Sequence, residues 1–481
     1  MLDTITSPYD GSTVGTLEKT DLAGAQAVIA TAVETFPAYR DLPRFVRADI
    51  LERAAGIIHE RREEFARLIA QEAGKPLYDA RGEVSRGVFN LRNAAVEARR
   101  FGGEEVPLDV DEAVAVYQTV PGDQAALGAD GAGHVQQVRK KIGLVRRIPS
   151  GPILAITPFN FPLNLVLHKV APALAVGATV VLKPAPQTPL TSVLLAEVLR
   201  DAGLPEGVLT VVHCDVDVAD AMVRDERLHI VTFTGSAAVG WHIKNAAGRK
   251  KALLELGGNG AVIVDADGDV DRAVSCSVRG GVVFAGQYCI GVQRILVHES
   301  RYEEFLGKLR EQVGAVVVGD PLQDGVECGP VIDARSADRI EAWIGEAVEA
   351  GATVEVGGTR EGNIIAPTVL SGVKPGMKVE DEEIFGPVVT IRPFSDFDDA
   401  IDQVNASKYG LQGSVFTQDL RKALRAADKV DVGALIVNDS PTFRVDSMPF
   451  GGQKQSGLGR EGTRWAMEEF TDTRLLVVDY S

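Results

Sequence analysis

Cysteine is scarce in this chain, with four residues among 481. They are Cys214, Cys276, Cys289 and Cys328. No two have the spacing of a zinc knuckle or a CxxC redox pair, which argues against a metal site held by cysteines. Four thiols in so long a chain also do not make a disulfide framework. We therefore expect a reducing compartment and no bound metal.

Long apolar runs are also missing. The most apolar stretch, residues 171–182, spans 12 residues and is too short to cross a bilayer. The first residues, Met1-Leu2-Asp3-Thr4, have neither the basic nor the apolar region of a signal peptide. We expect a cytoplasmic protein that does not contact a membrane.

Positive charge is in deficit. The chain has 50 Lys and Arg against 67 Asp and Glu, a net charge of −17. Such a surface is repelled by phosphate backbones and anionic lipids, so we expect no nucleic acid or membrane partner. The remaining composition, 45% hydrophobic and 24% charged, is that of an ordinary globular protein. The length predicts two or three domains with a large core.

The first third of the chain changes character twice. Strand and turn patterns at 1–19 are followed by amphipathic helices to about residue 100. Residues 103–147 then predict a two-stranded arm, with an extended stretch at 108–120 and a Gly- and Ala-rich tip. An apolar strand is expected at 474–479. Because an unpaired edge strand is a liability, we expect it to pair with the arm of another subunit. The acidic stretch 108–134 indicates no function of its own.

From residue 151 strands and helices alternate, which is typical of a parallel sheet covered by helices. The expected elements are strands at 153–156, 178–182, 208–212 and 229–233, and helices at 162–176, 189–201 and from 236. After Leu256 the alternation restarts, with strands at 261–264 and 292–297 and helices at 270–284, 303–316 and 334–350. The pattern predicts two α/β domains, with the ligand of the first beyond the carboxyl ends of its strands.

Two glycine-containing motifs are candidates for a dinucleotide. Gly457 to Gly462 matches GxGxxG, but no strand precedes it, so we reject it. Phe233 to Gly240 follows a strand and opens a helix, so its backbone N–H groups are suited to a pyrophosphate. An ordinary capped helix is the alternative.

Cys289 lies between Gly286 and Gly291, which allow the backbone to bend closely around a thiol. A thiol of ordinary pKa is only ~3% ionised near neutral pH. A nucleophilic cysteine therefore needs surroundings that favour the thiolate. A buried structural cysteine is the alternative.

Five short motifs, in one order, resemble the aldehyde dehydrogenase superfamily over essentially the whole chain. They are Thr157-Pro158-Phe159-Asn160-Phe161-Pro162, Lys183-Pro184-Ala185-Pro186-Gln187-Thr188-Pro189, Phe233-Thr234-Gly235-Ser236, Glu255-Leu256-Gly257-Gly258-Asn259 with the Cys289 segment, and Glu382-Glu383-Ile384-Phe385-Gly386-Pro387. The resemblance implies an α/β fold with a Rossmann-type cofactor domain, a second α/β catalytic domain and a β-arm for oligomerisation. The implied bounds are 1–107 with 148–256, then 257–455, and 108–147 with 456–481 for the arm and C-terminal tail. A homodimer or homotetramer is also implied.

The resemblance implies oxidation of an aldehyde to a carboxylic acid. Cys289 would form a thiohemiacetal, which loses hydride to NAD or NADP and leaves a thioester. Asn160 matches the amide that stabilises the oxyanion. Glu255 matches the base that activates water, and its presence favours hydrolysis over acyl transfer to coenzyme A. Lys169 and Glu461 match a proton-relay pair, for which an ordinary surface ion pair is the alternative.

The implied cofactor contacts come from all five motifs. They are Thr157, Pro158, Phe159, Lys183, Pro186, Gly235, Ser236, Leu256, Gly257, Glu383 and Phe385. Glu383 and Phe385 match residues at the nicotinamide ribose and ring, although an acidic loop is the alternative for Glu383. Pro186 stands where many NAD-preferring members have Glu. The missing carboxylate would have repelled a 2′-phosphate, so we predict that NADP is accepted.

The implied substrate pocket is lined by the helix after Asn160, the neighbours of Cys289 and a C-terminal loop. Its residues are Phe161, Asn164, Leu165, His168, Tyr288, Ile290, Thr442, Phe443, Arg444 and Phe450. Arg444 suits a carboxylate, phosphate or sulfonate, and a pair with Asp446 or Asp439 is the alternative. His168 assists it or is a satisfied core residue. The segment resembles the lactaldehyde-type branch, so we expect a small hydroxy- or acid-bearing aldehyde such as lactaldehyde, glycolaldehyde or a semialdehyde.

Two other functions compete with this one. A cysteine esterase or hydrolase needs a histidine base beside Cys289, and none of the seven histidines lies in a recognisable partner motif. A non-catalytic structural protein on the same fold would not need Cys289, Glu255 and Asn160 together. An aldehyde dehydrogenase is therefore the favoured prediction.

Overall fold

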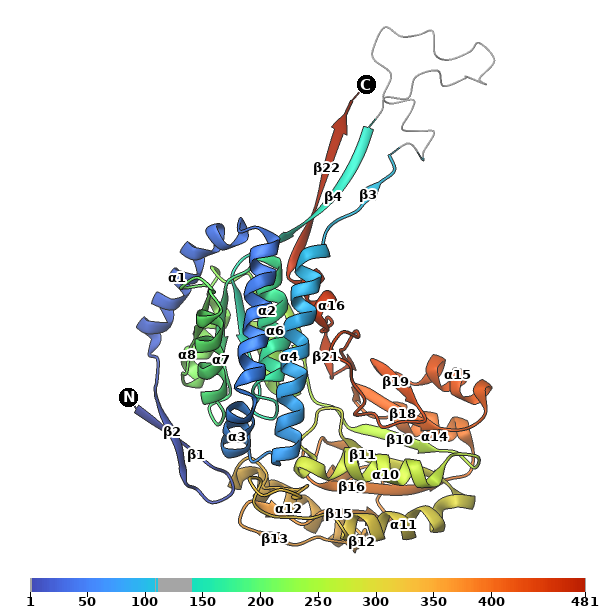
Figure 1. The fold of residues 1–481 in the computed structure, drawn as a ribbon. Helices are drawn as coiled ribbons and strands as arrows, with labels where there is room; N and C mark the ends of the chain where they lie inside the picture. The colour runs from blue at the N-terminus through green and yellow to red at the C-terminus, as the bar shows by residue number, and fades with distance from the viewer. Residues whose placement is uncertain (1, 109, 111–140, 481) are drawn as a thin grey trace, which may run out of the picture.

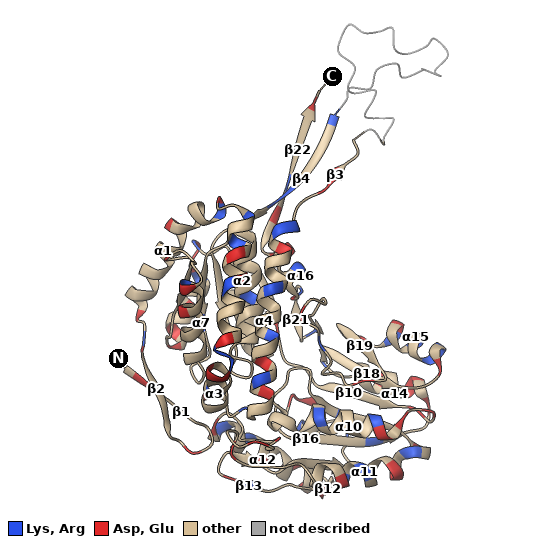
Figure 2. Ribbon diagram, in the orientation of Figure 1, with Lys and Arg blue, Asp and Glu red and all other residues tan. Residues whose placement is uncertain are grey.

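The fold is taken from a computed structural model, which describes residues 2–108, 110 and 141–480 (Figure 1). Two large sheets lie in two lobes, and a long arm projects from the first lobe. Charged residues of both signs are interspersed along the helices, as Figure 2 shows for α2 (Arg44–Glu60) and α4 (Leu77–Arg100). None of the helices described is long and apolar enough to span a bilayer.

The first lobe is built on a six-stranded sheet, as the alternating pattern predicts. Across the sheet the strands are β21 (Gly457–Leu458), β9 (Lys251–Glu255), β8 (Ile230–Thr234), β5 (Ile153–Ile156), β6 (Val180–Lys183) and β7 (Leu209–Val211). All neighbours are parallel except β21, which pairs antiparallel with β9. Because parallel strands end at one edge, the segments after β5, β8 and β9 come together there.

Helices cover both faces of this sheet. One face carries α6 (Asn164–Val176) and α7 (Leu190–Asp201), with α2, α3 (Arg62–Ala73) and α4 packed outside them. The other face carries α1 (Leu22–Arg40), α8 (Val216–Arg224) and α9 (Ala237–Ala246). Burial of side chains on both faces explains why the strands are mostly apolar.

The second lobe is built on a seven-stranded sheet. In spatial order its strands are β12 (Thr353–Val356), β15 (Thr368–Ser371), β16 (Val388–Phe394), β11 (Val292–His298), β10 (Gly260–Val264), β18 (Gln412–Phe416) and β19 (Ala434–Val437). Its helices are α10 (Val270–Gly281), α11 (Tyr302–Gly314), α12 (Ala334–Glu349), α13 (Lys378–Asp381), α14 (Phe397–Asn405) and α15 (Leu420–Lys429). The smaller elements of the chain are β1 (Leu2–Thr6), β2 (Thr13–Glu18), β13 (Arg360–Glu361), β14 (Ile364–Ile365), β17 (Tyr409–Gly410), β20 (Gln453–Lys454), the 3-10 turn η3 (Glu299–Arg301) and α16 (Thr463–Glu469).

The domain bounds implied by the motifs remain a prediction. Residues 456–481 were assigned to the C-terminal tail, and they contain β21 and α16. In the structure β21 extends the sheet of the first lobe and α16 packs on α6.

The arm is a three-stranded sheet in the order β22 (Thr471–Asp479), β4 (Lys141–Pro149) and β3 (Glu105–Val106). We expected the C-terminal strand to pair with the arm of another subunit. Strand β22 runs antiparallel to β4 of its own chain along its whole length. Because β22 is the edge strand of this sheet, pairing of its other side with another subunit stays a prediction. The predicted extended stretch at 108–120 and the tip lie almost entirely outside the described residues.

The helix predicted at 270–284 ends earlier. Helix α10 stops at Gly281, and a short 3-10 turn, η2 (Val283–Gly286), follows. Phe284 and Ala285 have φ of 51° and 52°, in the left-handed region that no α-helix uses. The helical apolar spacing through this stretch gave no sign of the reversal, which redirects the chain towards Cys289.

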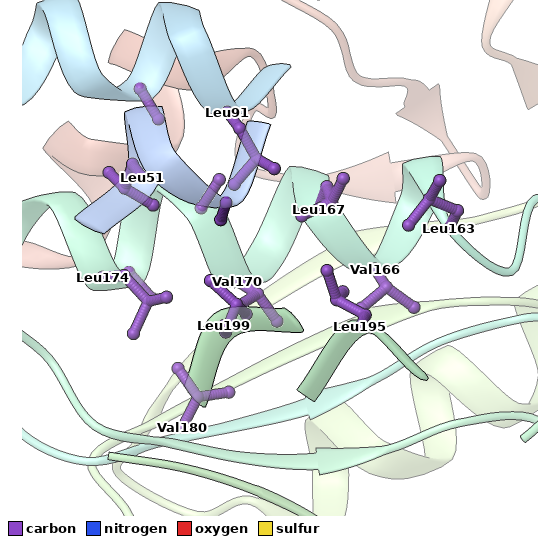
Figure 3. Close-up of a cluster of buried hydrophobic side chains, with 14 of the residues drawn as sticks. Leu51, Leu91, Leu163, Val166, Leu167, Val170, Leu174, Val180, Leu195 and Leu199 are labelled. Atoms are coloured by element: carbon purple, nitrogen blue, oxygen red, sulfur yellow. The ribbon is translucent and has the colours of Figure 1, made fainter. Parts of the chain in front are cut away.

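Helix α6 is the central element of the first core. All of its residues are buried, and Figure 3 shows Val166, Leu167 and Val170 pointing among side chains of α2, α4 and α7. Its first turn is fixed by Glu83 of α4, whose Oε1 accepts hydrogen bonds from the backbone N–H of Leu163 at 2.9 Å and Asn164 at 3.0 Å.

A buried cation compensates the charge of Glu83. The ammonium of Lys75 contacts Glu83 Oε2, and neither side chain is exposed. The same ammonium lies 3.5 Å from the ring centroid of Phe161 and 4.5 Å from that of Phe284. One ion pair therefore holds the start of α6 against the segment that leads to Cys289.

Removal of one partner of this pair leaves the other charge buried without compensation. Lys75→Met is expected to destabilise the fold by about 3–5 kcal/mol, and Lys75→Met/Glu83→Gln by less. The midpoint of urea denaturation, followed by tryptophan fluorescence, measures both. A double variant less stable than the single one would contradict this account.

Candidate active site

A cavity of about 980 Å³ lies between the two lobes at the carboxyl ends of β5, β8 and β9. Every residue assigned to the cofactor from sequence lines it, together with Asn160, Glu255 and Cys289. The segments after β5, β8 and β9 therefore meet at this cavity. Lys183, at the end of β6, and the segments that contain Cys289 and Glu383 line it too.

One end of the cavity has the chemistry of a phosphate and ribose site. Ser236 precedes α9 in an extended conformation and makes no capping hydrogen bond with its side chain, so the first N–H groups of α9 are free of a cap. Lys183 lines the same end, and its ammonium forms no hydrogen bond or ion pair with any described residue. Burial lowers the pKa of Lys183. A dinucleotide with two phosphates fits this donor set.

At the other end Glu383 is held by the backbone. Its Oε1 accepts a hydrogen bond from the N–H of Gly258 at 3.0 Å, and burial raises its pKa to about 7. A Cβ on Gly257 would lie 2.1 Å from Oε2 of Glu383, so a larger residue there would displace this carboxylate. Phe385 has φ of 50° and packs edge-on against Phe159, with 5.8 Å between centroids.

Further cavity residues were not found from the sequence. Arg339 and Trp343 of α12 and Tyr409 line the same space. Helical spacing indicates that α12 has a buried face, but it does not indicate which part of that face meets a cavity.

Cys289 lies at the inner end of the cavity. The chain reaches it through the left-handed residues of η2 and through Gly286, where a Cβ would lie 2.1 Å from the carbonyl oxygen of Gly386. Desolvation raises the pKa of the Cys289 thiol to about 12, and the strongest opposing influence is the positive charge of Arg444. The protein alone therefore favours the thiol, and Arg444 is the main group that favours the thiolate.

The amide of Asn160 lies on the segment that carries the thiol. Its side chain is buried, and Nδ2 donates a hydrogen bond to the backbone oxygen of Gln287 at 2.8 Å. That bond uses one N–H of the amide. The second N–H is left to donate to an oxyanion formed near Cys289.

Glu255 ends β9 and is buried, and its Oε2 has no hydrogen-bond partner among the described residues. Burial raises its pKa well above the usual range, and the negative charge of Glu461 raises it further. Lys169 and Arg444 act in the opposite direction. An unpartnered buried carboxylate that lines the cavity with Cys289 is suited to accept a proton from water.

Lys169 and Glu461 meet, with 2.5 Å between Nζ and Oε1. Both side chains are almost completely buried, so this is not a surface ion pair. Burial opposes ionisation of Glu461, but Lys169 and His168 outweigh it and hold the pKa of that carboxyl well below its usual range.

Several of the residues assigned to the substrate contact one another, whereas Thr442 bonds Ser440, Phe443 bonds Gln412 and Leu165 lines the cavity. The ring of Phe161 lies 5.5 Å from that of Tyr288, and Ile290 packs with Phe450 and Cys289. Asn164 donates towards Asp446 at 3.4 Å and also approaches His168 at 3.3 Å. They form a wall beside the thiol that is aromatic on one side and charged on the other.

Arg444 is the buried cation of that wall. Its guanidinium stacks on Phe450 at 3.6 Å and lies 3.5 Å from Glu461 and 3.8 Å from Asp446. The pair with Asp446 that we kept as an alternative is therefore present. Asp439 instead lies 3.3 Å from Arg272. The Nε of Arg444 is buried without a hydrogen-bond partner among the described residues, which leaves it one donor for a ligand.

A second arginine was missed by the sequence analysis. Arg86 of α4 binds Asp446 with both ends of its guanidinium, at 2.6 Å and 3.2 Å. Its side chain is 35% exposed while Asp446 is buried, so Arg86 connects the charged wall with solvent. The two residues are 360 positions apart in the chain, and no local pattern marks them as partners.

Comparisons with known proteins agree with this geometry. A family model described as the aldehyde dehydrogenase family matches residues 3–476. A 3-sulfolactaldehyde dehydrogenase of Priestia aryabhattai is 42% identical over 436 residues, which cover 90% of this chain and 86% of that protein. The crystal structure of aldehyde dehydrogenase 21 from Physcomitrella patens, in complex with the reaction product succinate, is 38% identical with a TM-score of 0.92 and covers 100% of this chain and 95% of that one.

A second solved structure bears on the cofactor. The NADP-dependent glyceraldehyde-3-phosphate dehydrogenase from Bacillus halodurans C-125, complexed with NADP, is 35% identical with a TM-score of 0.92 and covers 100% of this chain and 96% of that one. These likenesses confirm the α/β fold that the five motifs imply.

The raised pKa of Cys289 makes its reactivity strongly pH-dependent. With a pKa of about 12, roughly one thiol in 10⁵ is ionised at pH 7 without cofactor. Alkylation of Cys289 by iodoacetamide should then accelerate about tenfold per pH unit from pH 7 to 9.5, and Arg444→Met should slow it at every pH.

Peptide mass spectrometry follows this residue alone, and Cys289→Ala gives the background from the other thiols. A rate that levels off below pH 9 would show that the thiol is already activated.

Proposed function

The chain belongs to the aldehyde dehydrogenase family and oxidises aldehydes with NAD or NADP, and we propose that its substrate is a small aldehyde that carries an acid group. The observation that carries this proposal is the buried Arg444, which lies close enough to Cys289 to influence its pKa. A buried cation this near to Cys289 can contact a negative group on a short substrate that is bound at the thiol.

In the proposed reaction the Cys289 thiolate adds to the carbonyl carbon. The negative charge passes to the carbonyl oxygen, and the remaining N–H of Asn160 stabilises it. NAD or NADP, when bound, would supply the acceptor for the hydride that leaves the same carbon, and Glu383 and Phe385 would hold its ring end in the cavity. What remains on Cys289 is a thioester of the substrate acid.

Glu255 is the proposed base for the second half of the reaction. Its unpartnered Oε2 accepts a proton from water, and the resulting hydroxide attacks the thioester carbon. The Cys289 thiolate leaves and the free acid is formed. Lys169 and Glu461 are the proposed relay that carries the proton away from Glu255, since Glu461 exerts the strongest negative influence on Glu255.

Three relatives support an acid-bearing substrate. One acts on an aldehyde whose name denotes a sulfonate, one on a phosphate ester, and one holds succinate as its product. Two arginines, Arg444 and Arg86, supply positive charge beside the proposed aldehyde site of this chain. Lactaldehyde and glycolaldehyde, which are polar but uncharged, are the second choice.

The cofactor end favours acceptance of NADP. Pro186 lines the cavity without a charge, and Lys183 has an unpaired ammonium for the ribose or its 2′-phosphate. The NADP-bound relative also supports acceptance of NADP. We propose that both cofactors are used.

A homodimer or homotetramer in the cytoplasm is part of the proposal. The arm supports it, because β22 is an edge strand and presents Leu475, Leu476 and Val477 with about half of each side chain exposed. The four unpaired cysteines support a reducing compartment.

A panel of matched aldehydes tests the function. Succinic semialdehyde is compared with butanal, and glyceraldehyde-3-phosphate with glyceraldehyde, each with NAD and with NADP, by absorbance at 340 nm. We expect kcat/KM at least about tenfold higher for the acid-bearing member of a pair, from one charge-assisted contact. Equal values, or a preference for the uncharged member, would contradict the acid-bearing substrate. A cysteine hydrolase or a structural protein would give no absorbance change.

Arg444→Met separates recognition of the acid group from catalysis. We expect KM for succinic semialdehyde to rise about tenfold or more, because one buried charge-assisted contact is lost. KM for butanal should change less than about threefold, whereas kcat should fall for both substrates because Arg444 also favours the thiolate. Arg272→Met, an exposed arginine paired with Asp439, is the matched control. An equal rise of KM for both aldehydes would remove Arg444 from acid recognition.

A further inference from the structure

A second cavity, of about 640 Å³, is lined by the first turn of α4, by α10 and by the end of α11. It shares no lining residue with the cavity between the lobes. Val283 of η2 lines it, and the next residue, Phe284, donates its backbone N–H to the carbonyl oxygen of Glu327 at 2.9 Å. The second cavity therefore adjoins the turn that leads to Cys289, although neither the aldehyde nor the cofactor occupies it.

Two charged side chains of the second cavity are unpaired. Arg81 is saturated, because it donates to both oxygens of Glu63, at 2.9 Å and 3.0 Å, and to Asp324 at 3.2 Å. Asp79 of α4 and Arg279 of α10 also line the cavity, and neither forms a hydrogen bond or ion pair with any residue that the structure describes. One negative and one positive group are thus available to a ligand.

A second carboxylate, that of Glu327, adds to the charge of Asp79. Its Oε2 accepts a hydrogen bond from the N–H of Val317 at 3.2 Å, and its other oxygen has no partner among the described residues. Burial raises the pKa of Asp79 and Glu327 raises it further, whereas Lys75 and Arg279 oppose the rise. These mutual effects show that the three charged groups of the cavity are neighbours. Two desolvated carboxylates side by side are stabilised by a bound cation.

The rest of the second cavity is mostly apolar. The ring of Tyr78 lies 5.8 Å from the guanidinium of Arg279. Four valines contribute to the lining, namely Val278, Val283, Val316 and Val326. A matching ligand has an ammonium for the two carboxylates, a carboxylate for the guanidinium and an apolar body for the valines. Because the charged groups are neighbours, the two charges of the ligand must also be close together, as they are in an α-amino acid.

We infer that the second cavity binds a free α-amino acid with an apolar side chain, whose ammonium lies between Asp79 and Glu327 and whose carboxylate binds Arg279. Leucine, valine and methionine have this chemistry, and a cavity of this volume accommodates each of them. The inference does not depend on which aldehyde the enzyme oxidises. The bound amino acid contacts Val283, at the start of the turn that leads to Cys289.

Isothermal titration calorimetry of the full-length enzyme with L-leucine, L-valine and L-methionine measures this binding. The matched probes are 4-methylvalerate, which lacks the ammonium of leucine, and 3-methylbutylamine, which lacks its carboxylate. We expect L-leucine to bind at least about tenfold more tightly than either probe, because each probe loses a charge-assisted contact. Equal affinities of leucine and a probe, or no binding of any of the three amino acids at about 10 mM, overturn the inference.

Variants locate the bound amino acid. Asp79→Asn and Arg279→Gln should each weaken binding of L-leucine about tenfold or more. Arg279 is exposed, so its variant decides the question if Asp79→Asn does not fold. Arg272→Gln, at another exposed arginine of α10, is the matched control and should bind within about threefold of the parent enzyme. Arg444→Met should also retain binding, because Arg444 does not line this cavity.

Two results would place the amino acid elsewhere. L-leucine that binds equally well to Arg279→Gln does not use the second cavity. L-leucine that is lost in Arg444→Met, or that competes with succinic semialdehyde or NADP, occupies the cavity between the lobes. Either result overturns the inference and leaves the proposed aldehyde oxidation intact.

Discussion

The guanidinium of Arg444 is the charge on which the reactive end of the cavity depends. It is the strongest influence that lowers the pKa of Cys289, and it also opposes the raised pKa of Glu255 and helps to keep Glu461 ionised. Desolvation acts against ionisation at all three groups, so the site works with charges that only another buried charge can stabilise. If the same cation also receives the acid group of the substrate, recognition of the substrate and activation of the thiol are coupled through one side chain.

Helix α6 brings these groups to one place. Its first two turns carry Asn164, His168 and Lys169, which contact Asp446 and Glu461, while its apolar residues are buried among α2, α4 and α7. Glu83 fixes the start of the helix, and Lys75 joins it to the aromatic rings beside Cys289. A helix held so rigidly is a suitable support for a site in which hydrogen-bond positions matter to a fraction of an ångström.

Much of the fold and of the cofactor site could be predicted, because both depend on patterns between residues that are near one another in the sequence. The strand and helix alternation predicted both sheets, and most of the cofactor residues were assigned from short motifs at the ends of parallel strands, although Glu383 and Phe385 precede β16. What escaped prediction depends on contacts between distant residues. Arg86 reaches Asp446 across 360 positions, β22 found its partner within its own chain, and the left-handed backbone at Phe284 ended a helix that apolar spacing would have continued. The network around His168 escaped for the same reason.

In the proposed reaction one thiol and one carboxylate act in succession on the same carbon. The most direct test is Glu255→Gln mixed rapidly with NADP and the best aldehyde of the panel, followed at 340 nm and by mass spectrometry of the intact protein. The account predicts a burst of about one NADPH per active site, then little further turnover, with an acyl group on Cys289. Steady turnover without a burst, or an acyl group on any other residue, would contradict it.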